Sequence, residues 1–386
     1  SKGFTANGIC AGVKASNTTK KDLALIYCDK VCNSAAIFTK NLVKSDTIYV
    51  TKKHLENGTA QAVVVNSGNA NACNPDGYEK AEKMCSLAAD ALGVDENDVI
   101  VASTGVIGQP LPIEPIASGI EKLKGTLSKD GGISAAEAIM TTDTVKKQWA
   151  VETVLDGKKV TIGGMIHINM GTTLSFVTTD AAISSEMLKS ALIEAADVSY
   201  NMVSVDGDTS TNDTLAIMAS GYAGNKEITE KNDDYKTFTA VLTDAFKKVA
   251  KKLAKDGEGA TKLLICKVDG AKDDKSAKII SKSIICSSLV KAAMFGADAN
   301  CGRILCAIGY SGAETDVKKI DVSYKSAKGE ILVCKDGNGL VFDEDKAKEI
   351  LLEDEIEILV KLGDGNASAE AYGCDLTYDY VKINGD

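Results

Sequence analysis

A glycine followed by two threonines, Gly171-Thr172-Thr173, lies at the start of an apolar stretch that predicts a buried strand. A threonine hydroxyl is a weak nucleophile unless a base lies beside it, and an N-terminal threonine supplies that base through its own α-amine. Attack of Thr172 on the Gly171 carbonyl would break the chain and expose such an amine, and glycine leaves room for the strained geometry. The ordinary alternative is a strand entry with two β-forming threonines, and spacing alone favours it.

Three further loops place small and polar residues together after strand-like runs. They are VVVNSGNANAC (63–73), VIVASTGVIG (99–108) and VDGDTSTND (205–213). Glycine-containing turns at the end of a strand let backbone N–H groups face a ligand. In the second loop, Thr104 and Gly105 place a hydroxyl beside an N–H, which are the parts of an oxyanion hole. Each loop can also be a simple turn that binds nothing.

The elements that must position these loops alternate along the chain, which predicts an α/β or α+β layered fold with sheets covered by helices. A length of 386 residues is large for one core, so we expect two lobes. Strands are predicted at 22–28, 62–66, 98–102, 149–154, 159–166, 173–179, 214–219, 262–268, 319–324 and 330–334. Helices are predicted at 78–92, 113–125, 185–197, 234–254, 275–294 and 344–361.

The composition argues against several classes of function. The formal net charge of −10 opposes a nucleic-acid partner, because phosphate binding needs a concentrated basic surface. No apolar run approaches the roughly 20 residues of a membrane span, and the first residues lack the apolar core of a signal peptide. Eleven cysteines lie mostly inside apolar stretches, as reduced thiols do, so we expect a cytoplasmic protein. With two histidines and no CxxC pair, we expect no metal site.

Motifs spread over almost the full length of the chain, in a consistent order, resemble those of the glutamate N-acetyltransferase/ornithine acetyltransferase family of arginine biosynthesis. The matching stretches are GICAGVKASNTTKKDLALI (8–26), VVVNSGNANAC (63–73), STGVIGQPLP (103–112), IMTTDT (139–144), INMGTTL (168–174), VDGDTSTNDT (205–214), DGEGATK (256–262), LVKAAMFGADANCGRI (289–304), GYSG (309–312) and DLTYDYVKIN (375–384). The resemblance implies a self-processing ornithine-acetyltransferase-like fold with a smaller C-terminal lobe.

The same resemblance implies a reaction. The chain would cleave itself between Gly171 and Thr172 into an alpha fragment (1–171), which carries the oxyanion-hole loop, and a beta fragment (172–386), which carries the nucleophile at its N-terminus and the C-terminal lobe. N-acetylornithine would give its acetyl group to the Thr172 hydroxyl, and glutamate would then take it. The fragments are expected to assemble as an α2β2 heterotetramer. No cofactor is expected, and acetyl-CoA stays open as a second acetyl donor.

The family's motifs also assign residues around the nucleophile. Thr104 and the Gly105 N–H correspond to the oxyanion hole. A carboxylate such as Glu258 suits the cationic amine of ornithine, and Asn384 suits an amide or a carboxylate. The positions that the resemblance assigns to substrate contact are Thr141, Thr172, Glu258 and Asn384.

One departure from the family lies directly before Thr172. Family members read IGGMAKGSGMIHPNMATML, whereas this chain reads IGGMIHINMGTTL (162–174), so the segment with a substrate-contacting lysine is absent from the sequence. Two other hypotheses therefore stay open. One is an unprocessed or inactive paralogue that binds amino acids, and the other is an N-terminal-nucleophile amidohydrolase that passes its acyl group to water.

Overall fold

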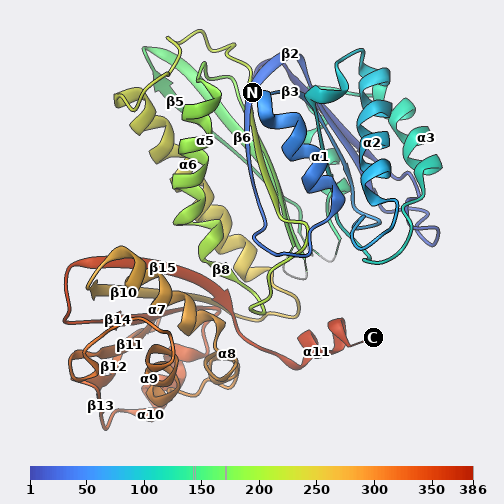
Figure 1. Cartoon of the computed structure of the whole chain (residues 1–386). Coiled ribbons are helices and arrows are strands. Elements are labelled where there is room, and N and C mark those ends of the chain that lie inside the picture. Colours follow the sequence, from blue (N-terminus) through green and yellow to red (C-terminus); the bar gives the residue numbers. More distant parts are fainter. Residues whose placement is uncertain (142, 144, 170–171, 386) are drawn as a thin grey trace. The chain divides into compact units, whose positions relative to one another are not determined.

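The computed structural model describes residues 1–141, 143, 145–169 and 172–385, with the backbone alone at 168, 169 and 172. Its chain divides into two units: unit 1 comprises Ser1–Ala195 and Thr209–Ala245, and the smaller unit 2 comprises Ala196–Asp208 and Phe246–Asp386 (Figure 1). Each unit contains a mixed β-sheet with helices packed on it. The layered α/β fold and the smaller C-terminal lobe expected from the sequence are therefore confirmed.

The sheet of unit 1 has the strand order β4-β3-β2-β9-β7-β6-β5, and β1 pairs with one half of β2. Two pairs of adjacent strands are parallel, namely β3 with β4 and β7 with β9. The other pairs are antiparallel. The strands are β1 (Phe4–Ile9), β2 (Leu23–Phe38), β3 (Thr59–Asn66), β4 (Val99–Ser103), β5 (Lys147–Leu155), β6 (Lys158–Asn169), β7 (Thr172–Thr179) and β9 (Thr214–Ala219).

Helices cover both faces of this sheet where β2 begins, so its first residues form a continuous apolar run. Leu23 and Leu25 pack with α2 (Gly77–Leu92) and α3 (Ile113–Lys124). Ala24 and Ile26 point to the opposite face and pack with α4 (Gly132–Ala138). The other helices that begin in unit 1 are α1 (Asp46–His54), α5 (Ser185–Asp197) and α6 (Asp233–Lys255).

The sheet of unit 2 has the order β13-β12-β11-β14-β10-β15-β8. Its strands are β8 (Val203–Ser204), β10 (Leu263–Ala271), β11 (Asp321–Ser326), β12 (Gly329–Lys335), β13 (Asn338–Gly339), β14 (Glu355–Lys361) and β15 (Ala367–Cys374). Its helices are α7 (Asp274–Cys286), α8 (Ser288–Phe295), α9 (Cys301–Gly309), α10 (Glu344–Leu351) and α11 (Tyr378–Asn384). Short 3₁₀ turns lie at Leu55–Asn57, Glu96–Asp98, Tyr200–Met202 and Val317–Lys319.

Two predicted helices of unit 2 are partly wrong. The helix expected over 344–361 ends at Leu351, and Glu355–Lys361 forms β14, where Ile356, Ile358 and Val360 alternate into the core. This strand pairs in parallel with β10. The helix expected over 275–294 is interrupted at Ser287, whose hydroxyl accepts a hydrogen bond from the Val290 N–H and starts α8.

Across the described ranges, no helix combines the length and the apolar character that a bilayer span requires.

Candidate active site

Thr172 is the first residue of β7, where it lies opposite Asn169 of β6 in an antiparallel pair. The next residue, Thr173, has its backbone N–H fixed by the Asp213 carboxylate at 2.6 Å. Gly171, the other half of the expected cleavage site, lies outside the described residues, and so does the side chain of Thr172. The backbone therefore places the expected nucleophile at a strand end.

Near this strand end, three polar loops from distant parts of the sequence meet. The Asn66 amide donates to the Ser103 hydroxyl at 2.7 Å, which ties the end of β3 to the end of β4. The Asn212 amide donates to the carbonyls of Ala70 and Ser103, each at 2.7 Å. Asn212 directly precedes Asp213, so the same loop reaches both the β3 and β4 ends and the first residues of β7. Buried side-chain amides thus link the three loops that the sequence singled out.

Thr104 and Gly105 follow β4 directly. Thr104 is buried, and its backbone N–H donates to the Asn66 carbonyl at 3.0 Å, whereas Gly105 is exposed. Gly105 has φ +132°, and a Cβ there would lie 2.7 Å from the Asn69 nitrogen. Both the backbone conformation and the space therefore require glycine. The turn therefore places the exposed backbone of Gly105 next to the buried Thr104. This arrangement is compatible with the oxyanion-hole hypothesis, which requires the Gly105 N–H to be accessible to a ligand.

Asp213 is a carboxylate that the sequence did not single out as a residue of the site. Burial of its carboxyl group raises its pKa to about 7, although the hydrogen bond from the Thr173 N–H acts in the opposite direction. Asp213 is hydrogen-bonded to Thr173, the residue that follows the expected nucleophile. A carboxyl group with a pKa near neutrality can exchange a proton at physiological pH. Its position in the polar VDGDTSTND loop was the only signal available in the sequence.

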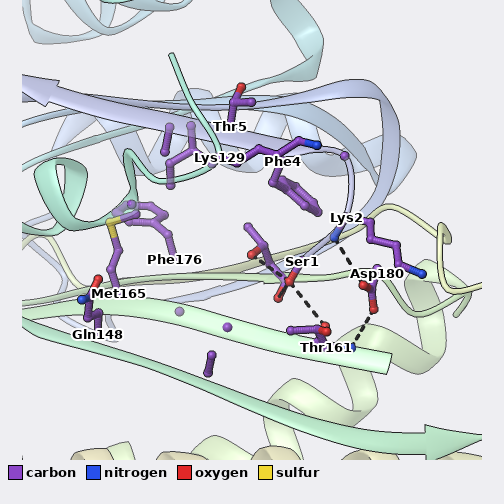
Figure 2. A pocket seen from close by; sticks show the side chains of 18 of the residues that line it. Ser1, Lys2, Phe4, Thr5, Lys129, Gln148, Thr161, Met165, Phe176 and Asp180 are labelled. Carbon is purple, nitrogen blue, oxygen red and sulfur yellow. Dashed lines mark hydrogen bonds between the residues drawn. The ribbon is translucent and has the colours of Figure 1, made fainter. Parts of the chain in front are cut away.

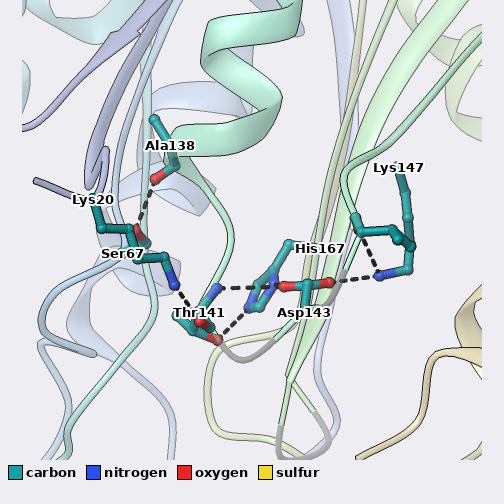
Figure 3. A network of polar contacts seen from close by, with 8 residues as sticks. Lys20, Ser67, Ala138, Thr141, Asp143, Lys147 and His167 are labelled. Atoms are coloured by element: carbon teal, nitrogen blue, oxygen red, sulfur yellow. Dashed lines mark hydrogen bonds and ion pairs between the residues drawn. The ribbon is translucent and has the colours of Figure 1, made fainter.

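Thr141 belongs to a polar network that also contains Asp143, Lys147 and His167 (Figure 3). The Thr141 Oγ1 lies 3.1 Å from His167 Nε2, and His167 Nδ1 is hydrogen-bonded to Asp143. Lys147 forms an ion pair with Asp143 at 2.7 Å. Burial alone would raise the pKa of Asp143, but its contacts with His167 and Lys147 lower the pKa to about 2, so the carboxylate stays ionised.

Glu258 and Asn384, the other two expected substrate contacts, belong to unit 2. Glu258 lies in the turn after α6, and Gly259 packs tightly enough on α11 that a Cβ there would lie 2.5 Å from the Tyr380 nitrogen. Burial raises the pKa of the Tyr380 hydroxyl to about 12, helped by the negative charges of Asp206 and Glu258. Asn384 is exposed at the end of α11 and donates to the Tyr380 carbonyl at 3.0 Å. Asp206 and Glu258 thus both lie near the Tyr380 hydroxyl.

A separate cavity of about 900 Å³ opens on the sheet of unit 1 (Figure 2). Its walls include Phe4, Met165 and Phe176, together with Asp180. Among the expected active-site residues whose side chains the structure describes, none lines this cavity. The candidate site is therefore chosen by the convergence of polar loops near the start of β7 and not by the size of a cavity.

The chain is similar over almost its whole length to a known protein family. Residues 5–386 match the ArgJ family. The chain is 50% identical to the arginine biosynthesis bifunctional protein ArgJ 1 of Clostridium acetobutylicum, over 99% of this chain and 95% of that protein. It is also 50% identical to ArgJ of Caldanaerobacter subterraneus subsp. tengcongensis, over 100% of this chain and 96% of that protein. The crystal structure of ArgJ from Bacillus halodurans is 45% identical, with a TM-score of 0.52, and the match covers 54% of this chain and 97% of that chain.

Proposed function

This chain belongs to the ArgJ family, and we propose that it moves the acetyl group of N-acetylornithine to glutamate through an ester on Thr172, after cleavage of the Gly171–Thr172 bond. It is an acyltransferase of arginine biosynthesis, an ornithine acetyltransferase/glutamate N-acetyltransferase. The observation that carries the proposal is the full-length match to ArgJ proteins.

In the proposed first half-reaction, the Thr172 α-amine accepts the hydroxyl proton as the Thr172 oxygen attacks the acetyl carbonyl. Thr104 and the Gly105 N–H stabilise the resulting oxyanion. The C–N bond then breaks, and the ornithine nitrogen leaves with the proton from the α-ammonium group. In the second half-reaction, the glutamate amine attacks the acetyl ester and restores the Thr172 hydroxyl. Acetyl-CoA would enter the same scheme as a second donor, and no cofactor is needed.

The proposed cleavage yields fragments 1–171 and 172–386, and the sheet of unit 1 supports their staying together. β6 and β7 are paired from Asn169 opposite Thr172 to Ile162 opposite Thr179. β9 of the second fragment is also paired with β2 of the first. The Bacillus halodurans chain matches 54% of this chain, about the share that the fragment 172–386 represents. By family resemblance, we propose that two copies of each fragment form an α2β2 assembly.

The proposal gives Thr141, Glu258 and Asn384 the substrate contacts that their family positions imply. The carboxylate of Glu258 suits the terminal ammonium of ornithine. We also propose a cytoplasmic location, because a reducing compartment suits the free thiols of all eleven cysteines, each within the described residues.

Acetyl transfer and mass analysis together test this proposal. Purified protein is mixed with N-acetylornithine and glutamate, and N-acetylglutamate and acetate are both measured. We expect N-acetylglutamate to form and denaturing mass spectrometry to give two fragments that begin at Ser1 and Thr172. Thr172→Ala should stay intact and lose at least about 10³-fold in rate, because it lacks both the nucleophile and the cleavage.

Other outcomes distinguish the alternatives. Thr172→Ser, which keeps a hydroxyl, is the matched control and should retain measurable transfer. An active but uncleaved wild-type chain would refute the proposed mechanism. An inactive, uncleaved chain that still binds ornithine would indicate a paralogue, and acetate release without N-acetylglutamate would indicate an amidohydrolase.

A further inference from the structure

Beside the expected nucleophile, three ionisable side chains are enclosed together. The side chains of Asp143 and His167 are 0% exposed, and that of Lys147 is 2% exposed. Enclosed charges persist only when they are paired and hydrogen-bonded. The proposed reaction assigns no role to any of the three, although His167 contacts the hydroxyl of Thr141 and Asp143 accepts from its backbone N–H.

The Asp143 carboxylate is the common acceptor of this cluster. The Lys147 ammonium donates to one Asp143 oxygen at 2.7 Å, and the other Asp143 oxygen accepts from the Thr141 backbone N–H at 3.3 Å and from His167 Nδ1. The Lys20 ammonium donates to the Thr141 carbonyl nearby. Because a carboxylate only accepts hydrogen bonds, the ring nitrogen of His167 that faces Asp143 is the protonated one, which defines the Nδ1–H tautomer of the neutral imidazole.

This tautomer fixes the direction of the next hydrogen bond. Neutral His167 with its proton on Nδ1 has only an acceptor at Nε2, which lies 3.1 Å from the Thr141 Oγ1. The Thr141 hydroxyl must then donate its proton to His167, and only the lone pairs of its oxygen are left for another partner. Such an oxygen can accept an N–H but cannot donate to a carboxylate.

We propose that His167 and Asp143 are positioning residues that fix the Thr141 oxygen as an acceptor for the α-nitrogen of the ornithine substrate. This deepens the proposed function and depends on substrate contact at Thr141. The proposed function gives the terminal ammonium to the Glu258 carboxylate, so the α-nitrogen is the remaining N–H group of the ligand. Selectivity for an α-amino acid thus originates in a buried imidazole that does not itself touch the substrate.

Ligand binding to the full-length protein tests this inference. The probes are L-ornithine and 5-aminopentanoate, which keeps the carboxylate and the terminal amine but lacks the α-nitrogen. The variants are Thr141→Val, which loses the hydroxyl, and His167→Asn, which can still donate to Asp143 but has no atom at the Nε2 position. Each should weaken ornithine binding about ten-fold in calorimetry, the usual effect of losing a hydrogen bond to a charged group. Neither should change binding of 5-aminopentanoate.

The double variant gives the decisive readout. If His167 acts through Thr141, the double variant should bind ornithine no more weakly than Thr141→Val alone. Thr141→Ser, the matched control, and His167→Gln, which keeps an acceptor near Nε2, should retain most of the affinity. Additive losses, equal losses for both ligands, or ornithine binding that does not depend on Thr141 would overturn the inference.

The result is separable from the proposed reaction. If these binding differences appear but no acetyl transfer occurs, the proposed function fails and the positioning role stands. If transfer occurs and the binding differences are absent, only the positioning role fails. Thermal unfolding and fragment masses are measured for each variant, since a purely structural histidine would change these without distinguishing the two ligands.

Discussion

The two sheets of the molecule differ in how they depend on the peptide bond between residues 171 and 172. In unit 1, strands β1 to β6 precede this bond, and β7 and β9 follow it. In unit 2, every strand of the described sheet follows it. After the proposed cleavage, unit 1 would be built from two chains and unit 2 from one. A sheet can therefore lose a covalent connection and keep its shape, provided that its cross-strand pairs and apolar faces stay in place.

Cross-strand pairs and apolar contacts join the two proposed fragments within the sheet of unit 1. β9 pairs with β2 from Thr214 opposite Phe38 to Ala219 opposite Asn33. The core on one face of the sheet combines Ala24 and Ile26 from the first fragment with Phe176 and Ala216 from the second. These contacts are the physical reason to expect that the fragments do not separate.

The largest expected effect comes from a cavity placed at this junction. Ile217 of β9 is fully buried and lies between Ala35 of β2 and Val177 of β7. Ile217→Ala should lower the free energy of unfolding by about 2 to 5 kcal/mol and promote separation of the cleaved fragments. Urea denaturation and native mass spectrometry measure the two effects.

A matched control lies in unit 2. Ile358 of β14 is equally buried, so Ile358→Ala should cost a similar free energy but leave the fragments associated at the same urea concentration. If both variants released the fragments equally, the contrast between a two-chain and a one-chain sheet would be wrong.

Effects of intermediate size are expected from one substitution in each unit, on kcat for unit 1 and on KM for unit 2. Thr104→Ala in unit 1 removes a donor to the oxyanion and should lower kcat about 10²-fold to 10³-fold with little change in KM. Glu258→Gln in unit 2 removes a charge that faces the substrate ammonium, so KM should rise about ten-fold or more. Steady-state kinetics on fully cleaved protein gives both constants. An unchanged kcat in Thr104→Ala would remove this residue from the oxyanion hole.

The smallest expected effect is a pH dependence of stability in unit 1. Because burial raises the pKa of Asp213 to about 7, the folded protein keeps a proton that the unfolded chain releases near pH 4. The resulting stabilisation is complete below about pH 4 and is lost as the pH rises through about 7. Asp213→Asn should flatten this part of the profile while its amide oxygen still accepts from Thr173. Urea midpoints across this range test it, and an unchanged slope would assign the proton to another group.

Much of the framework was predictable from the sequence, because periodic apolar runs determine buried strands and helices locally. The predicted helix at 185–197 coincides with α5, and the predicted strand at 214–219 coincides with β9. The strand Glu355–Lys361 was mistaken for a helix because its alternating pattern directly follows the helical pattern of α10. Only pairing with β10 and β11, which are distant in sequence, identifies it as a strand.

The site was predictable only in part. The polar loops within 63–73 and 99–108 were visible, since each directly follows an apolar run. The network of Thr141, Asp143 and His167 was not, because its members are drawn together by the fold and no spacing rule links them. The roles of Thr104, Thr141, Thr172 and Glu258 stay predictions, which the experiments above address, and the role of Asn384 also stays a prediction.

The pairing of β9 with β2 has a consequence for how the protein must be made. If residues 1–171 and 172–386 were synthesised separately, β2 would expose the backbone of Asn33–Phe38, and β6 would lack the partner that covers it in the intact sheet. Open edges of this kind recruit other chains and aggregate. If the chain folds before the proposed cleavage, both edges are paired from the start, and the intact precursor would protect its own fragments from aggregation.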